Sequence, residues 1–419
     1  MSSSSLKILV VGSGGREHAL VRAVATSPLV ENVYCWPGNG GILKQAVAVP
    51  VPNGELTELV SWAKKTNIDL VVIGPENELV AGLSNLLRAA GIKVFGPSQE
   101  AAQLEGSKIF AKNFMNEFLI PTARSEVVSS VKEALHAAQK FTPPYVLKAD
   151  GLAAGKGVFI CSDLDELRSA AQDLFENRKL GEAGRTALLE ENLPGEELSV
   201  LVLTNGKDYQ ILPYTRDHKR LKEGQTGPNT GGMGVVGPIQ VEERLAKLIE
   251  NQIVAPSIAG INKKDFLYRG VLFIGVMVVN GEPKVLEYNV RFGDPETQVL
   301  MPLLDGDWAA VFCKIAEGNV PDLNWLVQHV VCVVVAAKGY PEIPVKGVPI
   351  EGDVVSENKH QYVLHAGTIE KEGAFYVNGG RVLNCVGIGE TLDRALAQAY
   401  HRLSQINWPG MQYRRDIGR

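Results

Sequence analysis

The first hundred residues alternate short apolar runs with helix-like segments, and every apolar run stops at a glycine-containing loop. Helices are predicted from about Arg16, around the apolar repeat Leu56, Leu59, Val60 and Ala63, and over 79–90. The runs predicted as strands cover 6–11, 33–36, 69–73 and 93–95. This alternation predicts a parallel, doubly wound α/β sheet. Ligands bind such sheets beyond the carboxyl ends of the strands, here the loops 12–16, 37–41 and 74–76.

Beyond about residue 105 the predicted strands look antiparallel, which indicates an α+β arrangement. Asn280-Gly281 joins two of these strands and is a strong hairpin signal. A chain of 419 residues is too long for one core, so we expect domains at 1–104, 105–325 and 326–419. The predicted strands lie at 145–149, 158–161, 186–191, 198–203, 210–214, 271–279, 284–291, 329–337, 362–368 and 374–377, and a last helix lies near 391–405.

Composition excludes several classes of protein. The formal net charge of −5 provides no broad basic field, so neither nucleic acid nor an anionic membrane is an expected partner. The longest apolar run, 330–337, is too short to span a bilayer. The five cysteines are scattered without a Cys-x-x-Cys pair, and residues 1–5 form a polar tail that does not resemble a signal peptide. We therefore expect a cytoplasmic protein.

The first candidate binding segment is Gly12-Ser13-Gly14-Gly15-Arg16-Glu17-His18, between a strand and a helix. Backbone N–H groups at a helix start suit a phosphate. The segment nearly matches the dinucleotide fingerprint, but Glu17 takes the third glycine position and the second strand lacks the acidic residue that binds a ribose. A tight turn without a ligand stays possible, whereas Arg16 favours a phosphate on something smaller than a dinucleotide.

A second segment, 148–158, places a Gly/Ala loop between two strands with Lys148 and Lys156 at its ends. Such a loop can close over phosphates, although it lacks Walker A spacing, and the alternative is a hairpin with solvated lysines. Two acidic pairs, at 190–191 and 196–197, flank the turn Pro194-Gly195. A charged turn on the surface would show the same pattern. A basic cluster at 216–220 precedes the glycine-rich stretch 226–234, which fits either an anion site or a mobile surface loop.

The strand at 285–291 is the most informative segment, because its side chains alternate between two faces. Leu286, Tyr288 and Val290 are predicted on the apolar face. Glu287, Asn289 and Arg291 fall on the other, where a carboxylate and an amide oxygen suit Mg²⁺ and Arg291 suits a carboxylate or phosphate. A solvated polar face is the alternative. Asp294 is predicted as a helix N-cap with Pro295 at the first helical position, a structural and not a catalytic role.

Taken in order, nine segments resemble the phosphoribosylamine–glycine ligase family of the ATP-grasp superfamily. They are GSGGREHAL (12–20), PGNGG (37–41), GPE (74–76), LEGSKIFAKNF (104–114), KADGLAAGKGV (148–158), GEELS (195–199), DHKR (217–220), GPNTGGMG (227–234) and LEYNVRFGDPETQ (286–298). The resemblance implies central ATP-grasp domains with a lid at about 123–194 and a small mixed C-terminal domain. It also implies ligation of glycine to phosphoribosylamine through an acyl phosphate, by a monomer whose partners are glycine, phosphoribosylamine and ATP.

The resemblance assigns site residues by position, with Mg²⁺ or Mn²⁺ as cofactor. The catalytic residues are Arg291, Lys148 and Asp217, and the metal ligands are Glu287 and Asn289. Contacts to ATP are expected from Lys108, Lys148, Gly151, Gly155, Lys156, Gly157, Glu190, Glu191, Leu193 and Glu197. Contacts to the other substrates are expected from Gly14, Gly15, Arg16, Asn39, Glu76, Asp217, Lys219, Asn229, Thr230 and Arg291.

The chain departs from the pattern of many relatives in one strand, and this difference leaves the number of metal ions open. Many relatives carry an acidic metal ligand one strand earlier, but 270–277 contains no carboxylate here. The strongest rival is another carboxylate–amine ligase or a carboxylase on the same scaffold, against which DHKR and GPNTGGMG favour the glycine ligase. A nicotinamide oxidoreductase is disfavoured by Glu17, and a non-catalytic nucleotide-binding module would have little use for aligned Glu287, Asn289 and Arg291.

Overall fold

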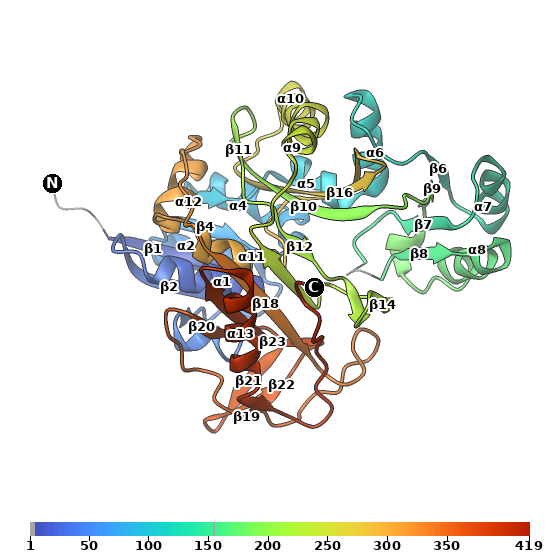
Figure 1. Cartoon of the computed structure of the whole chain (residues 1–419). Coiled ribbons are helices and arrows are strands. Elements are labelled where there is room, and N and C mark those ends of the chain that lie inside the picture. Colours follow the sequence, from blue (N-terminus) through green and yellow to red (C-terminus); the bar gives the residue numbers. More distant parts are fainter. Residues whose placement is uncertain (1–4, 154–155) are drawn as a thin grey trace.

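The computed structural model describes residues 5–153 and 156–419 (Figure 1). An all-parallel sheet in the order β3-β2-β1-β4-β5 forms its N-terminal part. Strands β1 and β4 are largely buried, which is why they read as continuous apolar runs. The predicted doubly wound fold is confirmed. Its elements are β1 (Leu6–Gly12), α1 (Gly15–Ala25), β2 (Val30–Pro37), η1 (Ile42–Lys44), β3 (Val47–Ala48), α2 (Leu56–Lys65), β4 (Leu70–Ile73) and β5 (Lys93–Phe95).

One helix predicted in this region is wrong, because the segment 79–90 belongs to two helices. They are α3 (Glu76–Val80) and α4 (Leu83–Ala89). Gly82 between them has a φ of +86°, a left-handed conformation that ends the first helix. As a result α3 begins directly after strand β4, and Glu76 lies in its first turn at the carboxyl edge of the sheet.

A four-stranded antiparallel sheet, in the order β6-β9-β7-β8, forms a separate unit that projects to the right in Figure 1. We call this sheet and its helices α7 and α8 the lid. It has its own apolar cluster, which includes Leu147, Leu167 and Leu189. The connection from the first sheet runs through α5 (Gln99–Gly106) and α6 (Lys108–Glu117). The lid consists of β6 (Ser125–Val128), α7 (Val131–Ala137), η2 (Ala138–Lys140), β7 (Tyr145–Ala149), β8 (Val158–Cys161), α8 (Leu164–Ala171), η3 (Gln172–Glu176), η4 (Gly181–Gly184) and β9 (Ala187–Glu191).

A second antiparallel sheet, β11-β10-β16-β17, shares a continuous apolar core with the N-terminal sheet. Asn280 and Gly281 both have positive φ, as a two-residue hairpin turn between β16 and β17 requires, so this predicted hairpin is confirmed. The elements are β10 (Glu196–Thr204), β11 (Tyr209–Ile211), α9 (Glu243–Ile249), η5 (Glu250–Val254), α10 (Ala255–Lys263), β16 (Gly270–Val279) and β17 (Glu282–Asn289).

The apolar face of β17 differs from its prediction at one position. The pairing with β16 shifts between Gly275 and Val276, so Leu286 has no partner in the ladder. This bulge moves Leu286 out of the apolar face. Val285 joins Tyr288 and Val290 in the buried core in its place.

The C-terminal part is built on a third sheet, β12-β15-β18-β23-β20. Two of its strands precede residue 325, so the sheet joins chain from both sides of the boundary expected there. The run predicted at 362–368 is two strands, because β20 ends at His365 and β21 begins at Thr368. The elements are β12 (Arg216–Asp217), β13 (Arg220–Lys222), β14 (Thr226–Asn229), β15 (Gly234–Gly237), α11 (Glu296–Leu300), η6 (Met301–Leu303), α12 (Trp308–Glu317), β18 (His329–Ala336), β19 (Glu351–Gly352), β20 (Gln361–His365), β21 (Thr368–Lys371), β22 (Ala374–Val377), β23 (Arg381–Gly389), α13 (Leu392–Leu403) and β24 (Ile406–Asn407).

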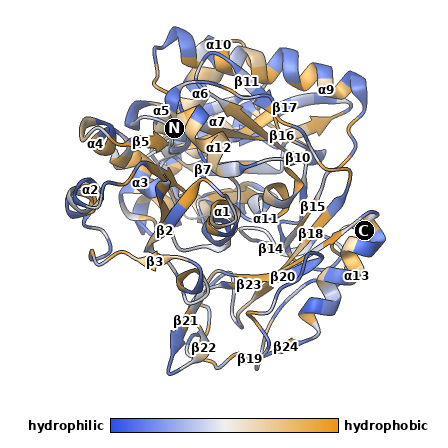
Figure 2. Cartoon of the chain, turned by 90° about the vertical axis from the view of Figure 1, so that its left-hand side faces the viewer, coloured by the Kyte–Doolittle hydropathy of each residue, from blue (hydrophilic) through white to orange (hydrophobic). Residues whose placement is uncertain are grey.

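Hydrophobic residues follow the strands, whereas covering helices such as α13 show mixed hydropathy (Figure 2). Within the described ranges, no helix is long and apolar enough to cross a membrane. The division into domains at 104/105 and 325/326 stays a prediction.

Candidate active site

Three of the segments predicted to carry chemistry, those that contain Lys148, Glu190 and Glu287, meet where the lid, α6 and β17 come together. Glu190, at the end of lid strand β9, is buried between two lysines: its Oε1 is 2.8 Å from Lys112 Nζ and its Oε2 is 2.6 Å from Lys148 Nζ. Lys148 also donates a hydrogen bond of 3.2 Å to Leu286 O in β17. Burial alone would raise the pKa of Glu190, but Lys148 and Lys112 lower it, so the carboxylate stays charged. This group of charges joins the lid to the central sheet.

The start of α6 is tied to the lid loop by Asp150. Asp150 Oδ1 accepts hydrogen bonds from Ser107 Oγ at 2.9 Å and from Ile109 N at 2.8 Å. Lys108 Nζ donates to Gly151 O at 3.5 Å. Burial lowers the pKa of Lys108, and Glu287 opposes that change. The loop predicted to cover phosphates therefore starts against α6, although Gly155 lies outside the described residues.

Glu287 is the acidic centre of a basic environment. Burial alone would raise its pKa, but Lys219, Lys148 and Lys108 together lower it. No hydrogen bond or ion pair joins its carboxylate to another described side chain, whereas Asn289 Oδ1 accepts one hydrogen bond, of 3.0 Å, from Arg291 Nη2. The Glu287 carboxylate and the second lone pair of Asn289 Oδ1 thus offer oxygen ligands on one face, of the kind that a divalent cation takes. Among described residues, no group of three or more His, Cys, Asp or Glu could hold a metal.

Arg291 lies between β17 and the N-terminal sheet. Its guanidinium contacts Glu76 Oε2 at 3.2 Å, Glu105 Oε1 at 2.8 Å and Phe292 O at 3.2 Å. Burial alone would lower the pKa of Arg291, but Glu105 and Glu76 raise it, and the guanidinium stays charged. Burial raises the pKa of Glu105 to about 7, against the opposing effect of Arg291. The predicted common face of Glu287, Asn289 and Arg291 is present.

The loops at the carboxyl edge of the parallel sheet are held by hydrogen bonds to neighbouring parts of the chain. Gly14 N donates to Glu17 Oε2 at 2.6 Å, and buried Arg16 binds Glu17 and Phe292 O. Asn39 donates to Ser13 O and His365 O and accepts from two backbone N–H groups, so its amide has no free hydrogen-bonding capacity. Gly15 is closely packed, because a Cβ there would lie 2.4 Å from Asn384 Nδ2 and would force that side chain to shift. Asn39 therefore fixes the loops at this edge of the sheet.

The predicted segment 217–230 brings further charges to the site. Lys219 forms an ion pair with Glu197, and Thr230 Oγ1 donates to Lys219 O at 2.8 Å, while Asn229 is exposed in β14. Asp217 Oδ1 is buried without a partner among the described residues. Burial and the neighbouring carboxyl of Glu296 raise the pKa of Asp217 well above its usual value. A cationic group bound there would restore the charged form of this carboxylate.

The prediction of Asp294 as the N-cap of the following helix is wrong, because α11 begins at Glu296 with Pro295 at the cap. Asp294 is nevertheless structural. Its Oδ1 accepts from Gln298 Nε2 at 2.7 Å, and its Oδ2 lies 3.4 Å from both Arg16 N and Arg381 Nη2. It joins α1, α11 and β23 because all three approach one point in space.

Four residues of this site were not found from the sequence. They reach the site from distant elements. Glu105, Lys112 and Glu296 lie inside motifs quoted for other residues, whereas Arg381 lies outside every quoted segment. These residues are Glu105, Lys112, Glu296 and Arg381.

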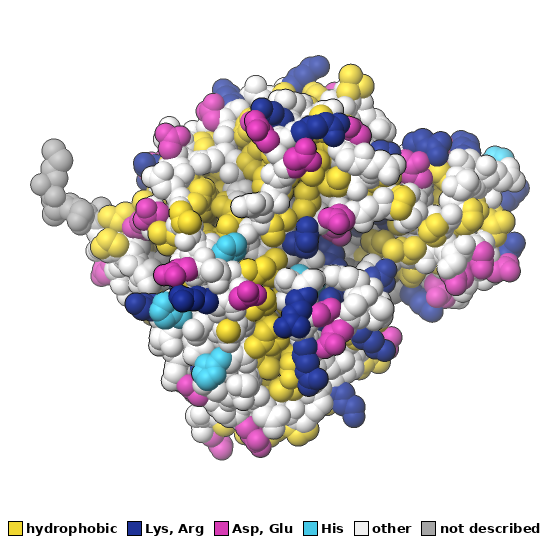
Figure 3. All heavy atoms as spheres, in the orientation of Figure 1, with side chains coloured by type: hydrophobic (Ala, Val, Ile, Leu, Met, Phe, Trp, Pro, Cys, Tyr) yellow, Lys and Arg dark blue, Asp and Glu magenta, His cyan; other side chains and the backbone are white. Residues whose placement is uncertain are grey.

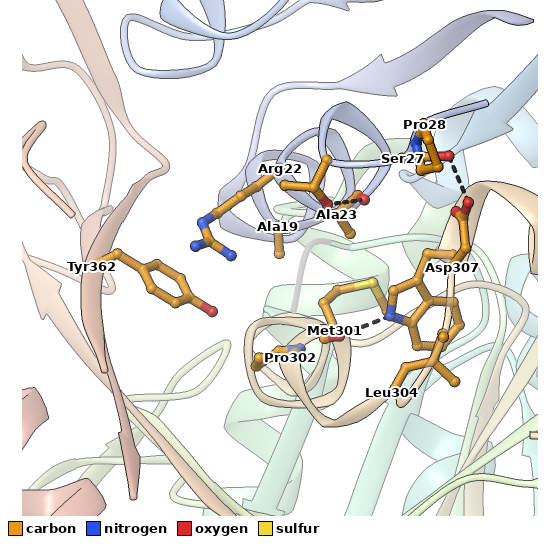
Figure 4. A pocket seen from close by; sticks show the side chains of 13 residues that line it. Ala19, Arg22, Ala23, Ser27, Pro28, Met301, Pro302, Leu304, Asp307 and Tyr362 are labelled. Atoms are coloured by element: carbon orange, nitrogen blue, oxygen red, sulfur yellow. Dashed lines mark hydrogen bonds between the residues drawn. The ribbon is translucent and has the colours of Figure 1, made fainter. Parts of the chain in front are cut away.

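A cavity of about 240 Å³ lies apart from these residues, beside α1, α12 and β20 (Figure 4). Arg22 stacks over Tyr362 at 3.9 Å from the ring centroid, and Ser27 Oγ donates to Asp307 at 2.7 Å. The cavity contains no residue predicted for the site. The surface is hollowed instead where the lid meets the rest of the molecule (Figure 3).

Three sheets define the class of protein. The lid sheet and a second antiparallel sheet face each other across buried lysines, and the parallel N-terminal sheet lies beside them. This is the arrangement of the ATP-grasp class. The fold alone is shared with the biotin carboxylase domain of Hydrogenobacter thermophilus 2-oxoglutarate carboxylase, at 18% identity and a TM-score of 0.74 over 97% of this chain and 91% of that chain. Phosphoribosylamine–glycine ligase from Thermotoga maritima is much more similar, at 37% identity and a TM-score of 0.87 over 99% of this chain and 100% of that chain.

Sequence comparison narrows the class to one family. The phosphoribosylglycinamide synthetase models match residues 6–105 (N domain), 106–297 (ATP-grasp domain) and 330–419 (C domain). Phosphoribosylamine–glycine ligases of Caldanaerobacter subterraneus subsp. tengcongensis and Synechocystis sp. are 40% and 44% identical, over 98% and 99% of this chain and 99% of each relative. The chain belongs to the phosphoribosylglycinamide synthetase family.

Proposed function

We propose that this chain ligates glycine to 5-phosphoribosylamine at the expense of ATP, giving glycinamide ribonucleotide, ADP and phosphate in purine synthesis. The observation that carries the proposal is the full-length match to ligases of this name at 40% to 44% identity. The site supports it, because buried lysines, free carboxylate and amide oxygens and a buried arginine lie together. We further propose that the chain acts as a cytoplasmic monomer.

The reaction has two steps. A carboxylate oxygen of glycine attacks the γ-phosphorus of ATP, and the bond from that phosphorus to the bridging oxygen breaks, giving glycyl phosphate and ADP. The nitrogen of phosphoribosylamine then attacks the carbonyl carbon, the bond to the phosphate oxygen breaks, and the nitrogen releases a proton. Both steps move charge onto oxygen atoms, so fixed positive groups lower the barrier.

Each side chain of the site has a part in this scheme. Lys108 and Lys148 neutralise the ATP phosphates, while the loop of Gly151, Lys156 and Gly157 covers them. Glu190, Glu191 and Leu193 lie at the edge of the lid where adenine would bind, and Glu197 would bind the ribose hydroxyls. Glu287 and Asn289 would hold Mg²⁺ or Mn²⁺, which supplies further charge neutralisation when bound. That the H. thermophilus relative was solved with MgADP supports this part of the proposal.

The remaining residues bind the two other substrates. Arg291 binds the glycine carboxylate and then the acyl phosphate. Asp217, whose Oδ1 has no partner among the described residues, receives a substrate amino group, beside Lys219, Asn229 and Thr230. Gly14, Gly15, Arg16, Asn39 and Glu76 form the wall at the edge of the parallel sheet that phosphoribosylamine would contact.

The test is ADP release from MgATP with glycine, with and without freshly made phosphoribosylamine. We expect ADP only when both co-substrates are present, and none when alanine replaces glycine. ADP formed with bicarbonate or another carboxylate would keep the ATP-dependent chemistry but overturn the substrate. No ADP under any combination, from folded protein that binds ATP, would indicate a nucleotide-binding module.

A further inference from the structure

Glu105 makes two contacts with the segment that carries Arg291. Its Oε1 lies 2.8 Å from Arg291 Nη2, and its Oε2 accepts a hydrogen bond of 2.7 Å from Val290 N. The residue lies in the last turn of α5, three positions before Lys108. One carboxylate therefore binds both the backbone and the guanidinium at the end of β17.

The second carboxylate on Arg291, that of Glu76, is held less firmly. Its side chain is 25% exposed, against 7% for Glu105, and it contacts Nε at 3.2 Å. Among the described residues, no backbone N–H of another element donates to Glu76 in the way that Val290 N donates to Glu105. An incoming substrate anion can therefore replace Glu76 beside the guanidinium more easily than it can replace Glu105.

The position of Arg291 matters because other oxygen atoms compete for it. Arg291 Nη2 already donates to Asn289 Oδ1 at 3.0 Å, and the Glu287 carboxylate lies close enough to influence the charge of Arg291. A guanidinium free to turn fully toward these oxygens would occupy the atoms that suit a divalent cation. Glu105 Oε1 and Asn289 Oδ1 share Nη2, at 2.8 Å and 3.0 Å, so Glu105 limits how far the guanidinium can turn toward these oxygens.

We propose that Glu105 is a positioning residue, which holds the Arg291 guanidinium toward the reacting carboxylate and limits how far it turns toward Glu287 and Asn289. The proposal rests on the function proposed above for Arg291. It predicts that replacing Glu105 lowers turnover by displacing Arg291 and leaves ATP binding unchanged.

The test is a double-mutant cycle between Glu105→Gln and Arg291→Lys in the full chain. Glu105→Gln keeps an oxygen for Val290 N but loses the charge, and we expect kcat to fall about 10- to 100-fold with an MgATP Kd within about twofold of wild type. In the Arg291→Lys background the same change should cost less than about threefold, because the geometry that it maintains is already lost. Glu100→Gln, an exposed position on the same helix, is the matched control and should leave kcat unchanged.

Two outcomes would overturn the proposal: a kcat for Glu105→Gln within twofold of wild type, or an equal cost in both backgrounds. If Glu105→Gln does not fold, Glu105→Asp keeps the charge but shortens the reach, and should lower kcat at least about fivefold; unchanged kcat there also overturns it. ADP release by the wild type with glycine and phosphoribosylamine tests the proposed function independently of this mutant cycle. If the wild type consumes a different carboxylate, the same cycle is run with that substrate.

Discussion

The lid and the central sheet are both antiparallel, yet they are stabilised differently. The lid has an apolar cluster of its own, with Leu147 and Leu167 at its centre. The central sheet shares its core with the parallel sheet, so that Leu9 and Ile274 belong to one cluster. The contacts from the lid to the remainder are largely polar, such as those of Glu190 with Lys112 and of Asp150 with Ser107.

This difference indicates that the junction between the lid and the body opens more easily than the core of the body. Apolar cores resist local opening, whereas a polar junction can separate when water replaces its partners. An opening of the lid would therefore break mainly polar contacts, while Arg291, Glu287 and Asn289 lie on the central body. The candidate site lies at the boundary between the two.

The largest expected effect separates turnover from nucleotide binding. Arg291→Ala removes a charge from the body and leaves the lid intact, so kcat should fall about 1,000-fold while MgATP affinity stays the same. Steady-state ADP release and equilibrium ATP binding measure the two quantities. Arg244→Ala, on the exposed face of α9, is the control. Normal turnover in Arg291→Ala would remove this residue from the mechanism.

The separate cores predict separate unfolding. Leu167→Ala in the lid and Leu272→Ala in the central sheet each truncate a fully buried leucine, at a cost of about 2–5 kcal/mol. The first should speed amide hydrogen exchange only in the lid, and the second should lower the free energy of global unfolding. If Leu167→Ala speeds exchange equally in β16, the lid and body form one cooperative unit.

The most gradual effect concerns two buried histidines of the body, His18 in α1 and His365 in β20. Burial lowers the pKa of His18 to about 3 and that of His365 to about 4, so both stay neutral in the folded protein. Below pH 6.5 the unfolded chain binds more protons, and the free energy of unfolding should fall by at most about 1.4 kcal/mol per pH unit for each histidine. Their contribution is complete above pH 6.5 and is lost as the pH falls toward 3.

His18→Asn tests this pH dependence. An asparagine Oδ1 can replace His18 Nδ1, which accepts a 2.7 Å hydrogen bond from His365 N. Chemical denaturation between pH 7 and pH 5 should give a shallower slope for the variant. Equal slopes would show that His18 does not cause the loss of stability.

The polar face of β17 could be predicted because strand alternation is a local property. The same rule misplaced Leu286, because a bulge depends on how the partner strand pairs. The central strand β23 was not predicted, since Asn384, Gly387 and Gly389 weaken its apolar pattern. Gly387 is required because α13 comes so close that a Cβ there would lie 2.2 Å from Ala395 O. The contact with α13 thus explains why glycine stands at 387, and this glycine is one reason that β23 was not predicted.

The sequence by itself determined the parallel sheet, the Asn280-Gly281 hairpin, the common face of Glu287, Asn289 and Arg291, and the family resemblance. Each of these depends on periodicity, turn chemistry or motif order within short stretches. Only the tertiary structure decided that Glu105 binds Arg291, that Lys112 binds Glu190 and that Asp294 joins three elements. These contacts link residues far apart in the chain, and no local pattern encodes them. They are retained because a charge that is buried without a partner would destabilise the fold.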